Sequence, residues 1–168
     1  MAELEQIRAE LHSLKNPNKA EIVKKYLKSP YVFYGVTVPQ LRKIASQYKN
    51  LDIYSTFNLF DELWNSGNHE EMSLALYLLT NHKKKFNLEF WDFLIKAERI
   101  EKFKTWDHVD EACSHTFGEI LVSNPQLNNE IKKFSESRNP WIRRISIVSQ
   151  YPSIKKGKIQ LTILLAEK

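Results

Sequence analysis

The types and spacing of Trp106 and Asp110 suit chemistry on a flat, positively charged ligand. The two residues lie four positions apart in the stretch TWDHVD. Because an α-helix turns once in about 3.6 residues, a helix here places both side chains on one face, one turn apart. The indole then offers an apolar plane and the carboxylate a negative charge. The spacing alone equally fits a structural role, since a tryptophan at a helix start often packs into the core.

The elements that position this pair are predicted to be helices throughout. Apolar residues recur every three or four positions, and only four Gly and six Pro are present to make turns. The one run that resembles a strand, residues 31–36, has no second run to pair with, so it is interpreted as an extended connector. Helices are expected over about 4–14, 22–27, 38–45, 53–66, 69–83, 87–98, 106–121, 126–136, 140–148 and 158–167.

Local signals mark several of these boundaries. Thr37, Thr105 and Asn139 are good N-cap residues, because their side-chain oxygens can accept a hydrogen bond from the first helical turn. A proline follows Thr37 and Asn139 near the first helical position, where its missing N–H costs nothing. Pro152 is expected to close the helix that begins after Asn139.

Length and composition predict a single all-α domain over residues 1–168. Short connections favour antiparallel helix pairs, and such pairs stack in HEAT-like arrays as a curved superhelix, or solenoid. The internal sequence repeat is weak, so a compact helical bundle is the alternative arrangement.

Positive charge is concentrated toward the C-terminus. The chain has a formal net charge of +5, and residues 131–168 hold nine basic and two acidic residues, a net charge of +7 for that segment. Such an excess attracts a polyanion. Lys155, Lys156 and Lys158 are candidates for phosphate contacts, although a solvated surface is the more common role of such lysines.

The sequence is typical of a cytoplasmic protein that makes no contact with membranes. Its single cysteine, Cys113, cannot form an internal disulfide, which is usual in a reducing compartment. No apolar run approaches the roughly 18 residues of a membrane span, and the N-terminus does not resemble a signal peptide. Cys113 itself is interpreted as a small buried apolar residue.

Three stretches together resemble a known family, the DNA alkylation repair enzymes of the AlkD type, which are HEAT-like DNA glycosylases. The first runs from Asn16-Pro17 through Tyr26 into FYGVTVPQLR at 33–42, the second is WDHVD at 106–110, and the third is NPWIRR at 139–144. They occur in the family's order and at its separations, and the match covers nearly the whole chain.

The resemblance implies hydrolysis of the N-glycosidic bond of cationic N3- or N7-alkylated purines in double-stranded DNA. It puts the catalytic carboxylate on Asp110 and its aromatic neighbour at the lesion on Trp106. It implies that Arg144 contacts the DNA backbone and that Tyr26 lines the same concave surface. Further candidates for DNA contacts are Trp141, Arg143 and Arg42. We expect no cofactor and no metal.

Two alternatives remain open. Family members usually continue for several helices beyond the one that carries Arg144, and one of these supplies a second tryptophan to the lesion pocket. This sequence ends at Lys168, so a non-catalytic HEAT-like module that binds DNA or another protein is the alternative function. A metal site at His108, Glu111 and His115, with Asp107 nearby, is a second alternative, because the spacing of the first three brings them near one helix face.

Overall fold

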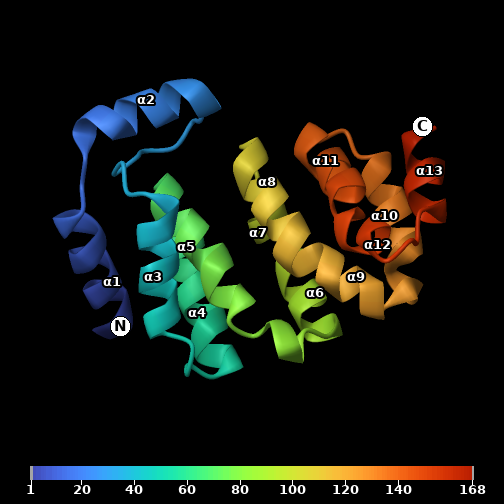
Figure 1. The fold of residues 1–168 in the computed structure, drawn as a ribbon, viewed down its shortest axis with the longest axis horizontal. Coiled ribbons are helices and arrows are strands. Elements are labelled where there is room, and N and C mark those ends of the chain that lie inside the picture. Colours follow the sequence, from blue (N-terminus) through green and yellow to red (C-terminus); the bar gives the residue numbers. More distant parts are fainter. Residues whose placement is uncertain (1, 168) are drawn as a thin grey trace. The chain divides into compact units, whose positions relative to one another are not determined.

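The computed structural model of the chain describes residues 2–167, most of which lie in helices (Figure 1). Over these residues the only β-type pairing is an isolated parallel bridge between Val32 and Asn68. The helices form two compact units, one up to His82 and one from Lys83 onward. The predicted all-α class is therefore confirmed.

The first unit is built around α5 (His69–Thr80), in which every side chain from 69 to 79 is buried. The helices α3 (Val38–Gln47) and α4 (Ile53–Trp64) pack against α5, and α1 (Ala2–Ser13) packs against α4. As Figure 1 shows, α4 and α5 run in opposite directions, as expected of helices joined by a short turn.

The helix α2 (Pro17–Leu27) has little burial of its own. It buries Leu27 alone, whereas the side chains of Ile22 and Tyr26 are about seven-tenths exposed. Its start is well defined, because Asn16 accepts a hydrogen bond from the backbone N–H of Lys19. The helix is therefore a surface element that presents apolar side chains to solvent.

A buried carboxylate fixes the connector between α2 and α3. The two oxygens of Glu70 accept three backbone hydrogen bonds, from Tyr34 at 3.0 Å, from Gly35 at 2.6 Å and from Val36 at 3.2 Å. The backbone N–H groups of residues 34–36 therefore find their hydrogen-bond partner in a side chain of α5 rather than in a sheet. The interpretation of residues 31–36 as an extended connector is confirmed.

The second unit consists of shorter helices packed on an aromatic core. Trp91 and Phe117 are fully buried and meet edge to face with ring centroids 5.4 Å apart. The helix α11 packs against α8, and these two helices carry the predicted site. The helix α12 packs against α9, which follows α8 in the chain. The helices are α6 (Leu88–Leu94), α7 (Ala97–Ile100), α8 (Trp106–Ala112), α9 (Gly118–Ser123), α10 (Asn128–Ser135), α11 (Pro140–Val148), α12 (Tyr151–Lys155) and α13 (Gln160–Ala166).

Two predicted boundaries were wrong. The helix expected over 87–98 is broken after Leu94, where Arg99 from α7 turns back and donates a hydrogen bond to the carbonyl of Phe93 at 3.1 Å. Pro152 does not close a helix but lies in the first turn of α12, where a proline is tolerated.

The long helix predicted from Trp106 contains one wider turn. Residues Cys113–Phe117 form a π-helical turn between α8 and α9. Directly after it, Gly118 lies so close to α12 that a Cβ atom would come within 2.6 Å of the Ser149 carbonyl oxygen and of the Pro152 ring. A glycine is therefore required for α9 and α12 to pack at this distance.

Over residues 2–167, no helix has both the length and the apolar character needed to cross a lipid bilayer.

Candidate functional site

The helix α8 presents Trp106 and Asp110 on one accessible face. Its other side buries His108, Val109 and Ala112. Trp106 is 38% exposed, and Asp110, one turn later, is half-buried. The spacing expected from the sequence is therefore found, and the indole is not a core residue.

Thr105 is the N-cap residue of α8 by position but not by hydrogen bonding. Its backbone is extended, as an N-cap requires, yet its hydroxyl makes no capping bond and is fully buried. The predicted start of the helix is thus confirmed, and the mechanism assigned to Thr105 is wrong. Tertiary packing rather than a local cap fixes this helix end.

The carboxylate of Asp110 is held by Arg144 from α11. The Nε atom of Arg144 donates to Oδ1 of Asp110 and its Nη2 atom donates to Oδ2, both at 2.9 Å. This is a bidentate pair, the strong geometry for arginine and a carboxylate. The hydrogen bonds to Asp110 raise the pKa of Arg144 above its ordinary value. The structure therefore brings two predicted site residues into direct contact.

The start of α11 is set by a local cap, as predicted. Asn139 accepts a hydrogen bond from the backbone N–H of Trp141 at 2.9 Å, and Pro140 occupies the first turn. The helix buries Ile145 and Ser146, which leaves Arg144 directed away from the core with its side chain 40% exposed. Trp141 is half-buried, one turn before Arg144 on the same helix.

Arg143 braces the loop before α11. Its Nη1 atom donates to the carbonyls of Ser137 at 2.7 Å and Arg138 at 3.1 Å. This contact was not foreseen from the sequence, which offered Arg143 only as a phosphate contact. The Nη1 atom of Arg143 thus has a structural role in the loop before α11.

Cys113 lies beneath the ion pair and is not a nucleophile. Its sulfur is fully buried and lies 3.8 Å from the carbonyl oxygen of Ile145. Burial raises the pKa of this thiol well above its ordinary value, and the negative charge of Asp110 raises it further. The thiol therefore stays protonated and inert at neutral pH, as its interpretation as a buried apolar residue requires.

The remaining predicted contacts lie in the first unit. Tyr26 is 72% exposed on α2, and Arg42 on α3 places its guanidinium over the ring of Tyr77, 5.1 Å from the centroid. The seven predicted residues are thus divided between the units, with five in the second and two in the first.

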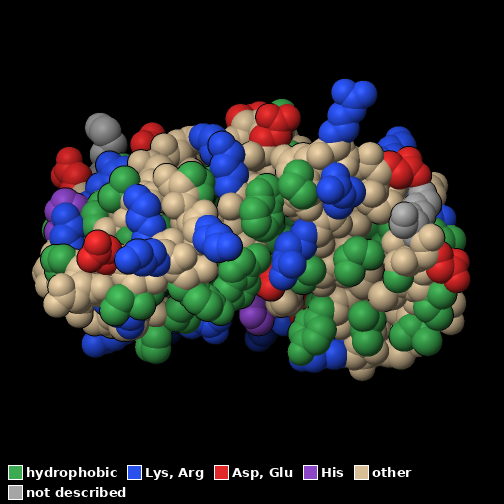
Figure 2. Space-filling model, turned by 90° about the horizontal axis from the view of Figure 1, so that it is seen from above, with side chains coloured by type: hydrophobic (Ala, Val, Ile, Leu, Met, Phe, Trp, Pro, Cys, Tyr) green, Lys and Arg blue, Asp and Glu red, His purple; other side chains and the backbone are tan. Residues whose placement is uncertain are grey.

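Basic side chains are spread widely over the surface. Figure 2 shows lysine and arginine side chains interleaved with hydrophobic ones on one face of the molecule. In the C-terminal segment Lys155, Lys156 and Lys158 are exposed, and Lys155 lies over the ring of Tyr151 with its ammonium 4.4 Å from the centroid. This mixture of cations and accessible aromatic rings suits a nucleic-acid backbone.

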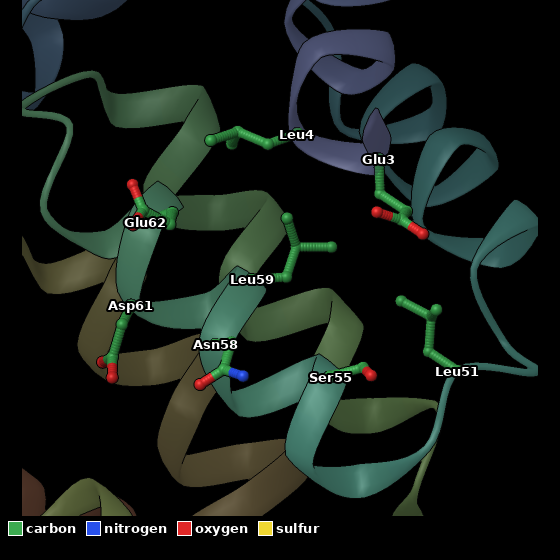
Figure 3. Close-up of a pocket in the computed structure, with 8 residues that line it drawn as sticks. All are labelled: Glu3, Leu4, Leu51, Ser55, Asn58, Leu59, Asp61 and Glu62. Atoms are coloured by element: carbon green, nitrogen blue, oxygen red, sulfur yellow. The ribbon is translucent and has the colours of Figure 1, made fainter. Parts of the chain in front are cut away.

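A groove of about 610 Å³ between α1 and α4 does not contribute to this site (Figure 3). Its rim carries the acids Glu3, Asp61 and Glu62, and none of its lining residues is basic. It therefore repels phosphate and contains no residue that the sequence predicted for the site.

The arrangement of His108, Glu111 and His115 favours helix stabilisation over metal binding. His108 is 1% exposed, whereas the side chain of His115 is 45% exposed. The imidazole of His115 lies 3.9 Å from the carboxylate of Glu111, one turn earlier. Such a pair stabilises a helix in the ordinary way.

The fold and site define an all-α protein whose second unit brings a tryptophan, an aspartate and an arginine onto two adjoining helices. The family model described as DNA alkylation repair enzyme matches residues 7–168, so the chain belongs to that family. The predicted resemblance is confirmed, and membership gives the chain a role in DNA repair.

A solved structure supports the fold. A chain from Enterococcus faecalis, described as a predicted DNA alkylation repair enzyme, superposes with a TM-score of 0.71 at 20% sequence identity. The similarity covers 90% of this chain and 72% of that one. No curated protein matched the sequence. At this identity the similarity establishes the helical fold, and the roles of the individual site residues remain predictions.

Proposed function

We propose that this protein is a DNA glycosylase that hydrolyses the N-glycosidic bond of cationic N3- or N7-alkylated purines in duplex DNA. The observation that carries the proposal is the accessible face of α8, where the indole of Trp106 and the carboxylate of Asp110 lie one turn apart. Family membership supports a DNA substrate, and the basic surface suits its backbone.

The residue types fit the charge changes of this reaction. The bond between C1′ and the purine nitrogen breaks, and its electron pair neutralises the positive charge of the base, so the base needs no general acid. The sugar becomes oxocarbenium-like and gains positive charge, which Asp110 stabilises. A water oxygen then attacks C1′, and its proton passes to Asp110 or to solvent.

The size of the electrostatic effect is sufficient for an already activated bond. Two unit charges about 4 Å apart at an effective dielectric constant near 20 attract by about 4 kcal/mol. At about 1.4 kcal/mol per tenfold, this corresponds to roughly a thousandfold in rate. Trp106 supplies a flat apolar surface against the sugar or the edge of the base.

The test is release of alkylated purine from duplex DNA that contains 7-methylguanine or 3-methyladenine. The wild-type chain releases the free base, Asp110→Asn lowers the single-turnover rate by about 100- to 1,000-fold, and Glu111→Gln, which removes a charge from the same helix, has little effect. Absence of release above background at high protein concentration would exclude the proposal.

The contact between Arg144 and Asp110 favours a second candidate, a DNA-binding protein without glycosylase activity. Both carboxylate oxygens that the reaction needs are engaged by the guanidinium. This candidate predicts salt-dependent duplex binding, weakened by Arg144→Ala, without base release. Efficient release of the lesion would exclude it.

A further inference from the structure

The two residues that matter most to the proposed function neutralise each other in the DNA-free protein. Arg144 is the predicted phosphate contact and Asp110 the predicted catalytic carboxylate, and each satisfies the other through two hydrogen bonds of 2.9 Å. As long as this pair persists, the charge of the guanidinium is largely cancelled by Asp110, so it attracts a phosphate weakly. The negative charge of Asp110 is likewise cancelled by Arg144, so it stabilises a cationic sugar weakly.

We propose that the Asp110–Arg144 pair is a lock that a DNA phosphate opens. In this exchange, which rests on the proposed function, Arg144 leaves the carboxylate for a phosphate of the bound strand, and Asp110 becomes an uncompensated anion. Arg144 is thus a positioning residue whose departure prepares Asp110. DNA binding and readiness for chemistry are coupled through a single guanidinium.

The exposure of the pair allows this exchange. The side chain of Arg144 is 40% exposed and that of Asp110 is 35% exposed, so a phosphate can reach the guanidinium without any backbone opening. Exposed ion pairs contribute little to stability, and phosphate accepts the same side-on bidentate geometry as a carboxylate. A phosphate that the rest of the DNA interface has already brought close can therefore replace Asp110 as the hydrogen-bond acceptor of Arg144.

The packing beneath the pair lets the helices stay in place. The buried sulfur of Cys113, the residue directly after α8, contacts the carbonyl of Ile145, the residue after Arg144. This contact joins the end of α8 to α11 without the ion pair. Ile145 on α11 and Val109 on α8 are also fully buried, and the two helices pack against each other. Opening the lock therefore requires only a rotation of the Arg144 side chain.

The lock makes a prediction opposite to that of a simple DNA contact. Removing the proposed catalytic carboxylate frees Arg144, so Asp110→Asn binds undamaged duplex DNA about three- to tenfold more tightly than the wild type, with a steeper salt dependence. Glu111→Gln is the matched control, because it removes one negative charge one residue away from Asp110 and leaves the pair intact. It changes the affinity by less than about twofold.

The binding experiment uses the full chain and a fluorescent, undamaged duplex of about 16 base pairs in a salt titration, with thermal unfolding as a check on each variant. Arg144→Gln weakens binding, and in the double variant Asp110→Asn, Arg144→Gln the gain disappears. Arg144→Lys keeps the positive charge but loses the bidentate geometry of the guanidinium. Combined with Asp110→Asn, it gives a smaller increase in DNA affinity than Asp110→Asn alone. An equal gain in Glu111→Gln, or a gain that persists in the double variant, would overturn the lock.

A kinetic experiment separates the lock from the proposed function. If Arg144 has left Asp110 in the complex, Arg144→Gln raises the DNA concentration needed for half-maximal rate but keeps the saturating single-turnover rate within about threefold. A large fall in that rate at saturating DNA would show that Arg144 stays on the carboxylate and would overturn the lock. Tighter binding by Asp110→Asn, together with no base release by the wild-type protein, supports the lock and excludes the glycosylase. Absence of DNA binding by every variant at low salt excludes both.

Discussion

Cys113 and Ile145 meet beneath the ion pair, with the sulfur 3.8 Å from the carbonyl oxygen. Cys113 lies one turn beyond Asp110, and Ile145 follows Arg144 directly. The end of α8 and α11 are therefore joined by a buried contact as well as by the exposed ion pair.

The burial of Cys113 predicts a thiol that does not react in the native protein. Its raised pKa means that the thiolate does not form until the pH is well above its ordinary value of about 8.5. Because the folded pKa is the higher one, the associated stability is complete below about pH 8.5 and is lost as the pH rises through the folded value. Labelling with a maleimide at pH 7.5 is expected only after denaturation, and rapid labelling of the native chain would contradict this.

The exposed indole of Trp106 is expected to matter for base release more than for folding. Trp106→Ala lowers release of alkylpurine by about 10- to 100-fold, since stacking of an aromatic ring on a base contributes about 1–3 kcal/mol. Trp106→Phe retains most of the activity because it keeps an aromatic plane. Tyr54→Ala, at an exposed aromatic residue on α4, is the control. Equal losses at Trp106 and Tyr54 would remove the case for a contact at the lesion.

Glu70 is expected to stabilise the first unit through the connector. Glu70→Gln replaces one acceptor oxygen by an amide N–H₂ that faces backbone donors, and it also removes the charge, at a cost of roughly 2–4 kcal/mol in the free energy of unfolding. Urea denaturation measures the change. Glu62→Gln, on the exposed side of α4, stays within about 0.5 kcal/mol. A loss below about 1 kcal/mol at Glu70 would mean that the connector is held by other contacts.

Gly118 is expected to tolerate no side chain. Alanine is normally favoured over glycine in a helix by about 1 kcal/mol, but here the added Cβ meets the carbonyl oxygens of Cys113 and Ser149 and the ring of Pro152, so Gly118→Ala destabilises by about 1–3 kcal/mol. The cost is smaller in a Pro152→Ala background, because the ring is one of the three obstructing groups. Thermal unfolding of the four proteins in this cycle measures the coupling, and additive effects would argue against the packing explanation.

Sequence predicted the features that depend on neighbouring residues. The caps at Thr37 and Asn139 are local hydrogen bonds, and both are present. The common face of Trp106 and Asp110 follows from helical geometry alone. These signals need no knowledge of the rest of the fold.

The features that were missed depend on residues far apart in the chain. Arg144 is 34 positions from Asp110, and nothing in either neighbourhood indicates that the two side chains pair. Thr105 has the right residue type for a cap, but the surrounding packing buries its hydroxyl without a capping bond. Pro152 was wrongly expected to end a helix, because a proline is compatible both with the end of one helix and with the first turn of the next, and the residue type does not distinguish them.

The π-helical turn at Cys113–Phe117 makes the helix that carries Asp110 one residue longer than a regular α-helix would be over the same path. Each residue of an α-helix advances the direction of the side chains by about 100°. Loss of one residue from this turn would restore a regular helix and rotate α8 relative to α9 by about that angle. Phe117 and Ile120 would keep their places in the core, whereas the face that carries Trp106 and Asp110 would turn away from Arg144. A single inserted residue thus sets the direction in which the site faces.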